Sequence, residues 1–122
     1  MTVSLKTCYE ALGGNYEQAL ERLRSERLVQ KYVLRFLEEK SYEELLAAME
    51  AKDAEAAFRA AHTLKGICLN LSFDALLASS SEMSEALRHG WADEAVDLLG
   101  QLREDYARTV DAIRAYEKKI AG

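Results

Sequence analysis

Proline is absent from all 122 residues of the sequence. A proline inside a helix removes a backbone donor and clashes with the preceding turn, so its absence permits long uninterrupted helices. Strand signals are missing as well, because no segment alternates polar and apolar residues and no Asn-Gly or Asp-Gly pair marks a hairpin. The chain is instead rich in Ala, Leu, Glu, Lys and Arg, which favour helices. The sequence therefore predicts an all-α fold.

Cysteines and long apolar runs are scarce. The two cysteines, Cys8 and Cys68, both fall on predicted apolar helix faces and do not make a disulfide framework. This indicates a reducing, cytoplasmic setting. No apolar run approaches the ~20 residues of a membrane span, and the N-terminus lacks the basic start and apolar block of a signal peptide. We expect no membrane as a partner.

Basic residues are outnumbered, with 16 Lys and Arg against 21 Asp and Glu and a formal net charge of −5. This balance argues against nucleic acid or an anionic membrane surface as the main partner. Hydrophobic residues make up 49% and charged residues 30%, which is ordinary for a soluble globular protein. Since 122 residues suit one core, we expect residues 1–122 to form a single domain.

Capping and turn signals divide the chain into helices. Two short ones are predicted near residues 4–12 and 15–23, separated by Gly13-Gly14, with Asn15 and Gln18 as a capping box. Four longer helices follow, and the first is expected to break or bend near residue 40. Their ranges and N-caps are 25–50 (Ser25, with Ser41 and Glu44 as a second box), 53–71 (Asp53), 72–89 (Ser72) and 93–119.

Short connections join these helices and make sequential neighbours antiparallel. The predicted architecture is an antiparallel up-down-up-down four-helix bundle over about residues 25–120. The short N-terminal helices, about 4–23, are expected to cover one end of it.

His62, one of only two histidines, falls at the centre of the helix predicted over 53–71. Apolar residues recur there about every 3.5 positions and define an inward stripe: Ala57, Ala61, Leu64, Cys68 and Leu71. His62 lies one residue off this stripe, in a row with Phe58, Lys65, Gly66 and Leu69. The imidazole is predicted to point outward, beside a cation and a glycine that leaves space. A reactive group is the better interpretation than a packing group.

The other histidine, His89, has a structural explanation. It falls in the last turn before Gly90, where a partial positive charge complements the helix dipole. Neither histidine has a glutamate three residues before it, so the Glu-x-x-His pairs of a metal-dependent bundle enzyme are missing. We expect no metal and no cofactor.

The stretch around His62 resembles the signature of histidine-containing phosphotransfer (HPt) domains of two-component phosphorelays. It reads Phe58-Arg59-Ala60-Ala61-His62-Thr63-Leu64-Lys65-Gly66, and the family pattern is His-x-Leu-Lys-Gly on the second long helix of a four-helix bundle. The resemblance covers most of the chain. It includes the glycine pair after the first helix, the helix through Phe36-Leu37, the break at Asn70-Leu71-Ser72, and Phe58 and Phe73, which match the related N-terminal domain of chemotaxis histidine kinases.

This resemblance implies that His62 accepts a phosphoryl group from an aspartyl phosphate on a receiver domain and passes it to another receiver. Lys65 would stabilise the phosphoryl oxygens and Gly66 would admit the partner. In this family the Mg²⁺ and the acidic pocket belong to the receiver. The chain would be a carrier without kinase or phosphatase activity of its own, a cytoplasmic monomer whose partners are response-regulator receivers or a hybrid sensor kinase. Its length and capped ends favour a free-standing carrier.

Two positions depart from the family pattern. Leu69 stands where a small residue or glycine is common, and it either extends an apolar docking patch with Phe58 or packs against neighbouring helices. We expect Phe58, Arg59 and Leu69 to contact the partner. Chemotaxis-kinase members orient the imidazole with a glutamate on the following helix. This chain has Ser84 at that position, and the nearby Glu82 and Glu85 are expected to point in other directions from the helix.

A non-transferring adaptor that only binds a receiver or kinase is the alternative function. The presence of His62, Lys65 and Gly66 together speaks against it, because a decoy has no need of all three.

Overall fold

The computed structural model describes residues 4–122, and the first three residues of the predicted 1–122 domain lie outside this range. Between residues 4 and 122 the chain is helical and contains no strand, which confirms the all-α prediction. The elements are α1 (Leu5–Leu12), α2 (Tyr16–Leu23), α3 (Glu26–Arg35), the 3-10 helix η1 (Phe36–Glu38), α4 (Ser41–Glu50), α5 (Ala54–Leu71), α6 (Asp74–Leu87) and α7 (Glu94–Ala121).

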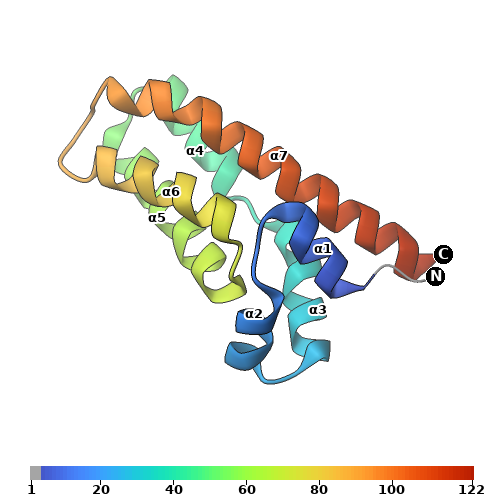
Figure 1. Ribbon diagram of the computed structural model, residues 1–122. Coiled ribbons are helices and arrows are strands. Elements are labelled where there is room, and N and C mark those ends of the chain that lie inside the picture. Colours follow the sequence, from blue (N-terminus) through green and yellow to red (C-terminus); the bar gives the residue numbers. More distant parts are fainter. Residues whose placement is uncertain (1–3) are drawn as a thin grey trace.

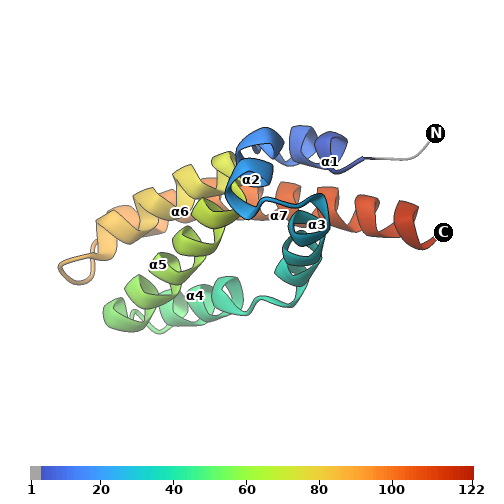
Figure 2. The same cartoon turned by 90° about the horizontal axis from the view of Figure 1, so that it is seen from below.

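The main body is a helical bundle in which α5 packs on both α4 and α6, and α6 also packs on α7 (Figure 1). Only Ser72 and Phe73 separate α5 from α6, so these two helices run side by side in opposite directions. The helix α1 packs along α7, while α2 and α3 contact each other and α5 (Figure 2). Within residues 4–122, no helix is both long enough and apolar enough to cross a membrane.

Aromatic side chains tie the N-terminal helices to the bundle. The ring of Phe73 lies 5.5 Å from that of Tyr9 and 5.3 Å from that of Phe36, and all three residues are fully buried. Each such pair adds about 0.5–1.5 kcal/mol beyond the area it buries. The Tyr9 hydroxyl also donates to the carbonyl of Leu71 at 2.8 Å. These contacts hold the C-terminal end of α5 in place.

Several predicted helix starts are confirmed. The side-chain oxygens of Asn15, Ser25 and Asp53 each accept a hydrogen bond from a backbone N–H three residues later, at 3.0–3.2 Å. Gly13 ends α1 with φ 77°, the left-handed conformation that glycine adopts without strain. A Cβ on Gly14 would lie 2.6 Å from the carbonyl oxygen of Ser72. The glycine pair is therefore required by the fold.

Two predicted caps are wrong, because both serine hydroxyls are engaged elsewhere. Ser41 is the first residue of α4, and its hydroxyl donates to the carboxylate of Glu39 at 2.6 Å. That carboxylate also accepts from the N–H groups of Lys40 and Ser41, so Glu39 takes over the capping role. Ser72 ends α5 with φ 57°, and its hydroxyl donates to Gln18 at 2.9 Å, so α6 begins without a side-chain cap.

The predicted break near residue 40 is confirmed as a complete interruption. The helix expected over 25–50 consists of α3, the single turn η1, two non-helical residues and α4. Phe36 at the start of η1 is buried in the aromatic cluster, and its packing favours a bend at this position.

Candidate functional site

The 18-residue helix α5 has two unlike faces. The predicted inward stripe is confirmed, since every member is buried: Ala57, Ala61, Leu64, Cys68 and Leu71. His62 lies off this stripe and is exposed, as the spacing predicts. Burial of one face fixes the rotation of the helix about its axis, and that rotation presents the imidazole to solvent.

The imidazole of His62 rests on the side chain one turn before it. Its ring is stacked on the ring of Phe58, with centroids 5.6 Å apart and planes 19° from parallel. Phe58 is half-buried, and the guanidinium carbon of Arg88 from α6 lies 5.8 Å from its ring centroid. The Nε of Arg88 donates to the Glu85 carboxylate at 3.0 Å. Two helices thus contribute to the surroundings of His62.

Lys65 and Gly66 follow His62 by one turn on the same side of α5. Lys65 is half-buried and Gly66 is exposed. A Cβ built on Gly66 would meet no atom within 4 Å, so the packing of the chain does not require a glycine here. Glycine in a helix interior destabilises it by about 0.5–1 kcal/mol relative to alanine. The space beside His62 is left open at a small loss of helix stability.

The candidate contact residues differ in exposure. Leu69 is 50% exposed, so it is not packed away against neighbouring helices. Arg59 is exposed and pairs with Glu55 one turn earlier, at 2.8 Å. Phe58 turns part of its surface into the core. Exposed apolar and basic groups thus lie on both sides of His62 along the helix.

At the level of His62, α6 carries a serine and not an acid. Because α5 and α6 are antiparallel, the contact between Phe58 and Arg88 puts Ser84, one turn before Arg88, level with His62, one turn after Phe58. Ser84 is buried, and its hydroxyl has no hydrogen-bond partner among the described residues. Within residues 4–122, the side-chain contact at the imidazole is a ring stack and not a hydrogen bond.

Sequence reasoning missed Arg88. It lies 26 positions after His62, on another helix, and no local motif marks it. The predicted antiparallel pairing brings the end of α6 toward the start of α5, but only the packing of the two helices sets which residues lie level with one another.

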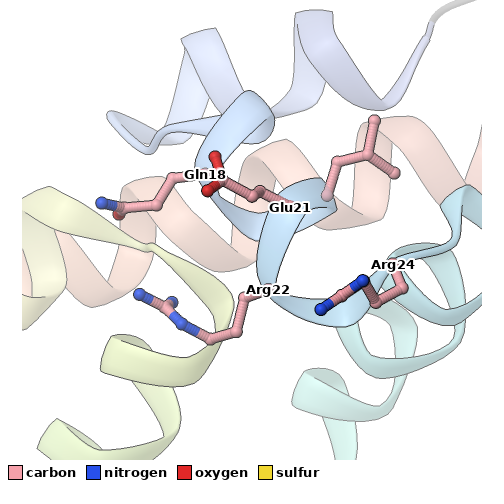
Figure 3. Close-up of a pocket in the computed structure, with 5 residues that line it drawn as sticks. Gln18, Glu21, Arg22 and Arg24 are labelled. Atoms are coloured by element: carbon pink, nitrogen blue, oxygen red, sulfur yellow. The ribbon is translucent and has the colours of Figure 1, made fainter.

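Three hollows in the surface are lined by residues other than His62. One, of about 760 Å³, is lined by Gln18, Leu20, Glu21, Arg22 and Arg24 (Figure 3). Its Arg22 extends to the C-terminal end of α5 and donates to Asn70 O at 3.2 Å and Ser72 Oγ at 3.1 Å, a capping role. A site on an exposed helix face cannot enclose a small molecule as a concave pocket does. The geometry suits the surface of another protein.

The two thiols are not candidate nucleophiles. Burial raises the pKa of Cys8 to about 11 and also raises the pKa of Cys68. Both are free and buried, so neither presents a thiolate near neutral pH. Within residues 4–122, no group of three or more His, Cys, Asp or Glu side chains could hold a metal ion.

The family model described as Hpt domain matches residues 17–112, well over half of the chain. This span runs from α2 into α7 and contains His62, Lys65, Gly66 and Arg88. Comparisons with curated proteins and with solved structures found no match.

Proposed function

The chain belongs to the Hpt domain family, and from that premise we propose that it is a phosphorelay carrier with His62 as its phosphoacceptor. Hpt domains act in histidine phosphotransfer and interact with receiver domains and kinases. His62 takes the phosphoryl group from an aspartyl phosphate of one receiver and passes it to an aspartate of another. One observation carries the proposal: within the family signature, His62 and Gly66 lie on the exposed face of α5, with His62 open to a protein partner.

The reaction needs no group beyond the two proteins and the receiver's Mg²⁺. A neutral imidazole has a nitrogen lone pair, which attacks phosphorus while the bond from phosphorus to the aspartyl oxygen breaks. The aspartate leaves as a carboxylate. The proton on the other ring nitrogen stays in place, so the phosphorylated imidazole is cationic. Transfer onward reverses these steps on a second receiver. The carrier therefore does not act as a kinase or a phosphatase by itself.

Lys65 and Gly66 are assigned the supporting roles. The phosphoryl group passes through a transition state with charge spread over three oxygens, and a cation one turn from His62 can stabilise them. Gly66 leaves the approach open, which is supported by the empty space around its Cα. The receiver supplies the Mg²⁺ and the acidic pocket around its own aspartate.

The receiver is proposed to dock over α5, contacting Leu69, Arg59 and the outer part of Phe58. The exposure of Leu69 and Arg59 supports this footprint. Apolar contact at Leu69 would contribute affinity, and Arg59 can pair with the acidic surface around the aspartate of a receiver.

We further propose that residues 1–122 form one domain with up-down-up-down topology in its main bundle, acting as a cytoplasmic monomer without nucleic-acid or membrane partners. Contacts from outside the matched span support the single domain. The Tyr116 hydroxyl donates to Gln30 at 2.8 Å, which ties α7 to α3. Tyr9 ties α1 to the end of α5.

The test mixes the protein with a receiver domain phosphorylated on aspartate with labelled phosphate. Wild type and His89→Gln should take up label that is lost in acid and stable in alkali, whereas His62→Gln should take up none. Equal labelling of His62→Gln would overturn the assignment. Absence of label on wild type, together with retained binding to the receiver, would favour the non-transferring adaptor.

A further inference from the structure

The imidazole of His62 lies on an aromatic platform built from two helices. We use the term Phe58 platform for Phe58 of α5 and Arg88 at the end of α6. His62 stacks on the ring of Phe58 at 5.6 Å and 19°, and the Arg88 guanidinium lies 5.8 Å from the same ring. Both bonds from Arg88 to the Glu85 carboxylate measure 3.0 Å. The platform is therefore held by the core beneath it and by an ion pair on α6.

A near-parallel stack limits how an exposed imidazole can turn. An exposed side chain on a helix samples several rotamers, and only some of them aim a ring nitrogen away from the helix. The face of Phe58 favours the rotamers in which the imidazole plane lies along it, because residues one turn apart on a helix meet side by side. Phe58 itself is half-buried against the core and moves less than a solvated residue. Phe58 can therefore restrict the orientation of the exposed imidazole of His62.

Nothing else among the described residues performs this task. The position level with His62 on α6 is Ser84, a buried hydroxyl without a hydrogen-bond partner. The nearest acid along that helix, Glu85, is paired with Arg88. A stack also suits the reaction itself. The imidazole becomes cationic when it is phosphorylated, and the negative face of an aromatic ring attracts a cation.

We propose that Phe58, held in place by Arg88, is a positioning residue that orients the imidazole of His62 for phosphoryl transfer in place of a hydrogen-bonded acid. This inference rests on the proposed function of His62. It assigns Phe58 a role in the rate of transfer, separate from any part it has in binding the receiver.

The test measures single-turnover transfer from a phosphorylated receiver at increasing receiver concentration. Phe58→Leu keeps apolar bulk but removes the aromatic face. Its maximal rate constant should fall about tenfold, since a small misplacement of a reacting group slows transfer steeply. The half-saturating receiver concentration should stay within about twofold of wild type. Phe58→Tyr keeps the ring and should restore the rate.

A matched control removes an aromatic stack on another side of the bundle. Tyr42 is half-buried on α4 and stacks on Tyr106 of α7 at 3.7 Å. Tyr42→Leu and Phe58→Leu should both lower thermal stability, but Tyr42→Leu should leave the rate constant unchanged. An equal fall in rate for both variants would mean that loss of stability is responsible, and would overturn the proposal.

A spectroscopic readout does not depend on transfer. The ring protons of His62 should shift in the NMR spectrum of Phe58→Leu, because the ring current of Phe58 is lost, while those of His89 serve as the reference. Should Phe58→Leu fail to fold, Arg88→Gln carries the test, with an expected rate loss of about threefold. An unchanged rate together with unchanged His62 resonances would overturn the inference.

The two levels of inference fail in different ways. If wild type takes up no label, the proposed function is wrong. If wild type is labelled on His62, and Phe58→Leu either transfers at the same maximal rate or loses only affinity for the receiver, then the positioning role alone is wrong.

Discussion

The two faces of α5 differ in role, because one packs in the core and the other is exposed to solvent. The inner face consists of small and aliphatic residues that are buried at every predicted position. The outer face carries an exposed histidine, a lysine, a glycine and a half-exposed leucine within two turns. Burial of the inner face fixes the rotation of the helix about its axis, and this rotation exposes the residues of the outer face. Substitutions on the inner face should therefore change the stability of the fold, and those on the outer face should change the rate of phosphoryl transfer.

Two glycines show the same contrast. Gly14 is required by the fold, since a side chain there would collide with the backbone of Ser72. Gly66 meets nothing within 4 Å of where its Cβ would be. Gly66 therefore leaves open space one turn after the candidate phosphoacceptor.

The largest expected effect comes from the inner face. Leu64 is fully buried, so Leu64→Ala should lower the free energy of unfolding by about 2–5 kcal/mol. Urea denaturation monitored by circular dichroism would measure this. The fraction that remains folded should still be labelled on His62. A folded Leu64→Ala protein without label would break the separation of the two faces.

Lys65→Ala, on the outer face, should change the rate of transfer and not the stability of the fold. We expect the transfer rate constant to fall about 10- to 100-fold, because the phosphoryl oxygens lose a stabilising cation at a partly exposed site. The unfolding midpoint should move little. Arg103→Ala, which removes an exposed cation from α7, is the control and should leave the rate unchanged. A wild-type rate for Lys65→Ala would remove its assigned role.

Gly66→Ala and Gly100→Ala form a matched pair. Both glycines lie in helices with free space around them, so each substitution should raise the free energy of unfolding by about 0.5–1 kcal/mol. Only Gly66→Ala should slow transfer, because its methyl group stands in the path of the receiver. If the two variants transfer equally fast, the open approach at Gly66 has no function.

Ser84→Ala and Ser80→Ala should change the free energy of unfolding in opposite directions. The Ser84 hydroxyl is buried without a partner, so its removal should stabilise the fold by about 1 kcal/mol. The Ser80 hydroxyl donates to the carbonyl of Leu76 at 2.7 Å, and its loss should destabilise by a similar amount. Thermal unfolding would measure both. Transfer should be unchanged in each case, and a slower Ser84→Ala would show that its hydroxyl assists His62.

Alkaline pH should lower the stability of the fold through the buried thiol of Cys8. The pKa of Cys8 is about 11 in the folded chain against an ordinary value of 9.0. Above pH 9 the unfolded chain therefore releases this proton before the folded chain does, and stability falls as pH rises from 9 toward 11. Unfolding midpoints measured between pH 8 and 10.5 should decline, and less steeply for Cys8→Ala. A midpoint of wild type that rises over this interval would contradict the assignment.

Much of the fold could be read from local patterns. The absence of proline, the apolar repeat along α5 and the caps at Asn15, Ser25 and Asp53 each depend on residues within one or two turns, so single-sequence reasoning reached them. It failed at Ser41 and Ser72. The Ser41 hydroxyl donates to Glu39, and the Ser72 hydroxyl donates to Gln18, which lies 54 positions before it. A capping motif cannot show such competition.

By itself the sequence determined which residues of α5 face inward and which face outward, because helical periodicity converts spacing along the chain into direction. It also placed His62, Lys65 and Gly66 of the family signature on the outward side. The tertiary structure alone decided which residues of α6 lie near His62. The packing of α6 on α5 brought Arg88 over Phe58 and a serine to the level of the imidazole, and the relative height of two helices depends on the whole core between them.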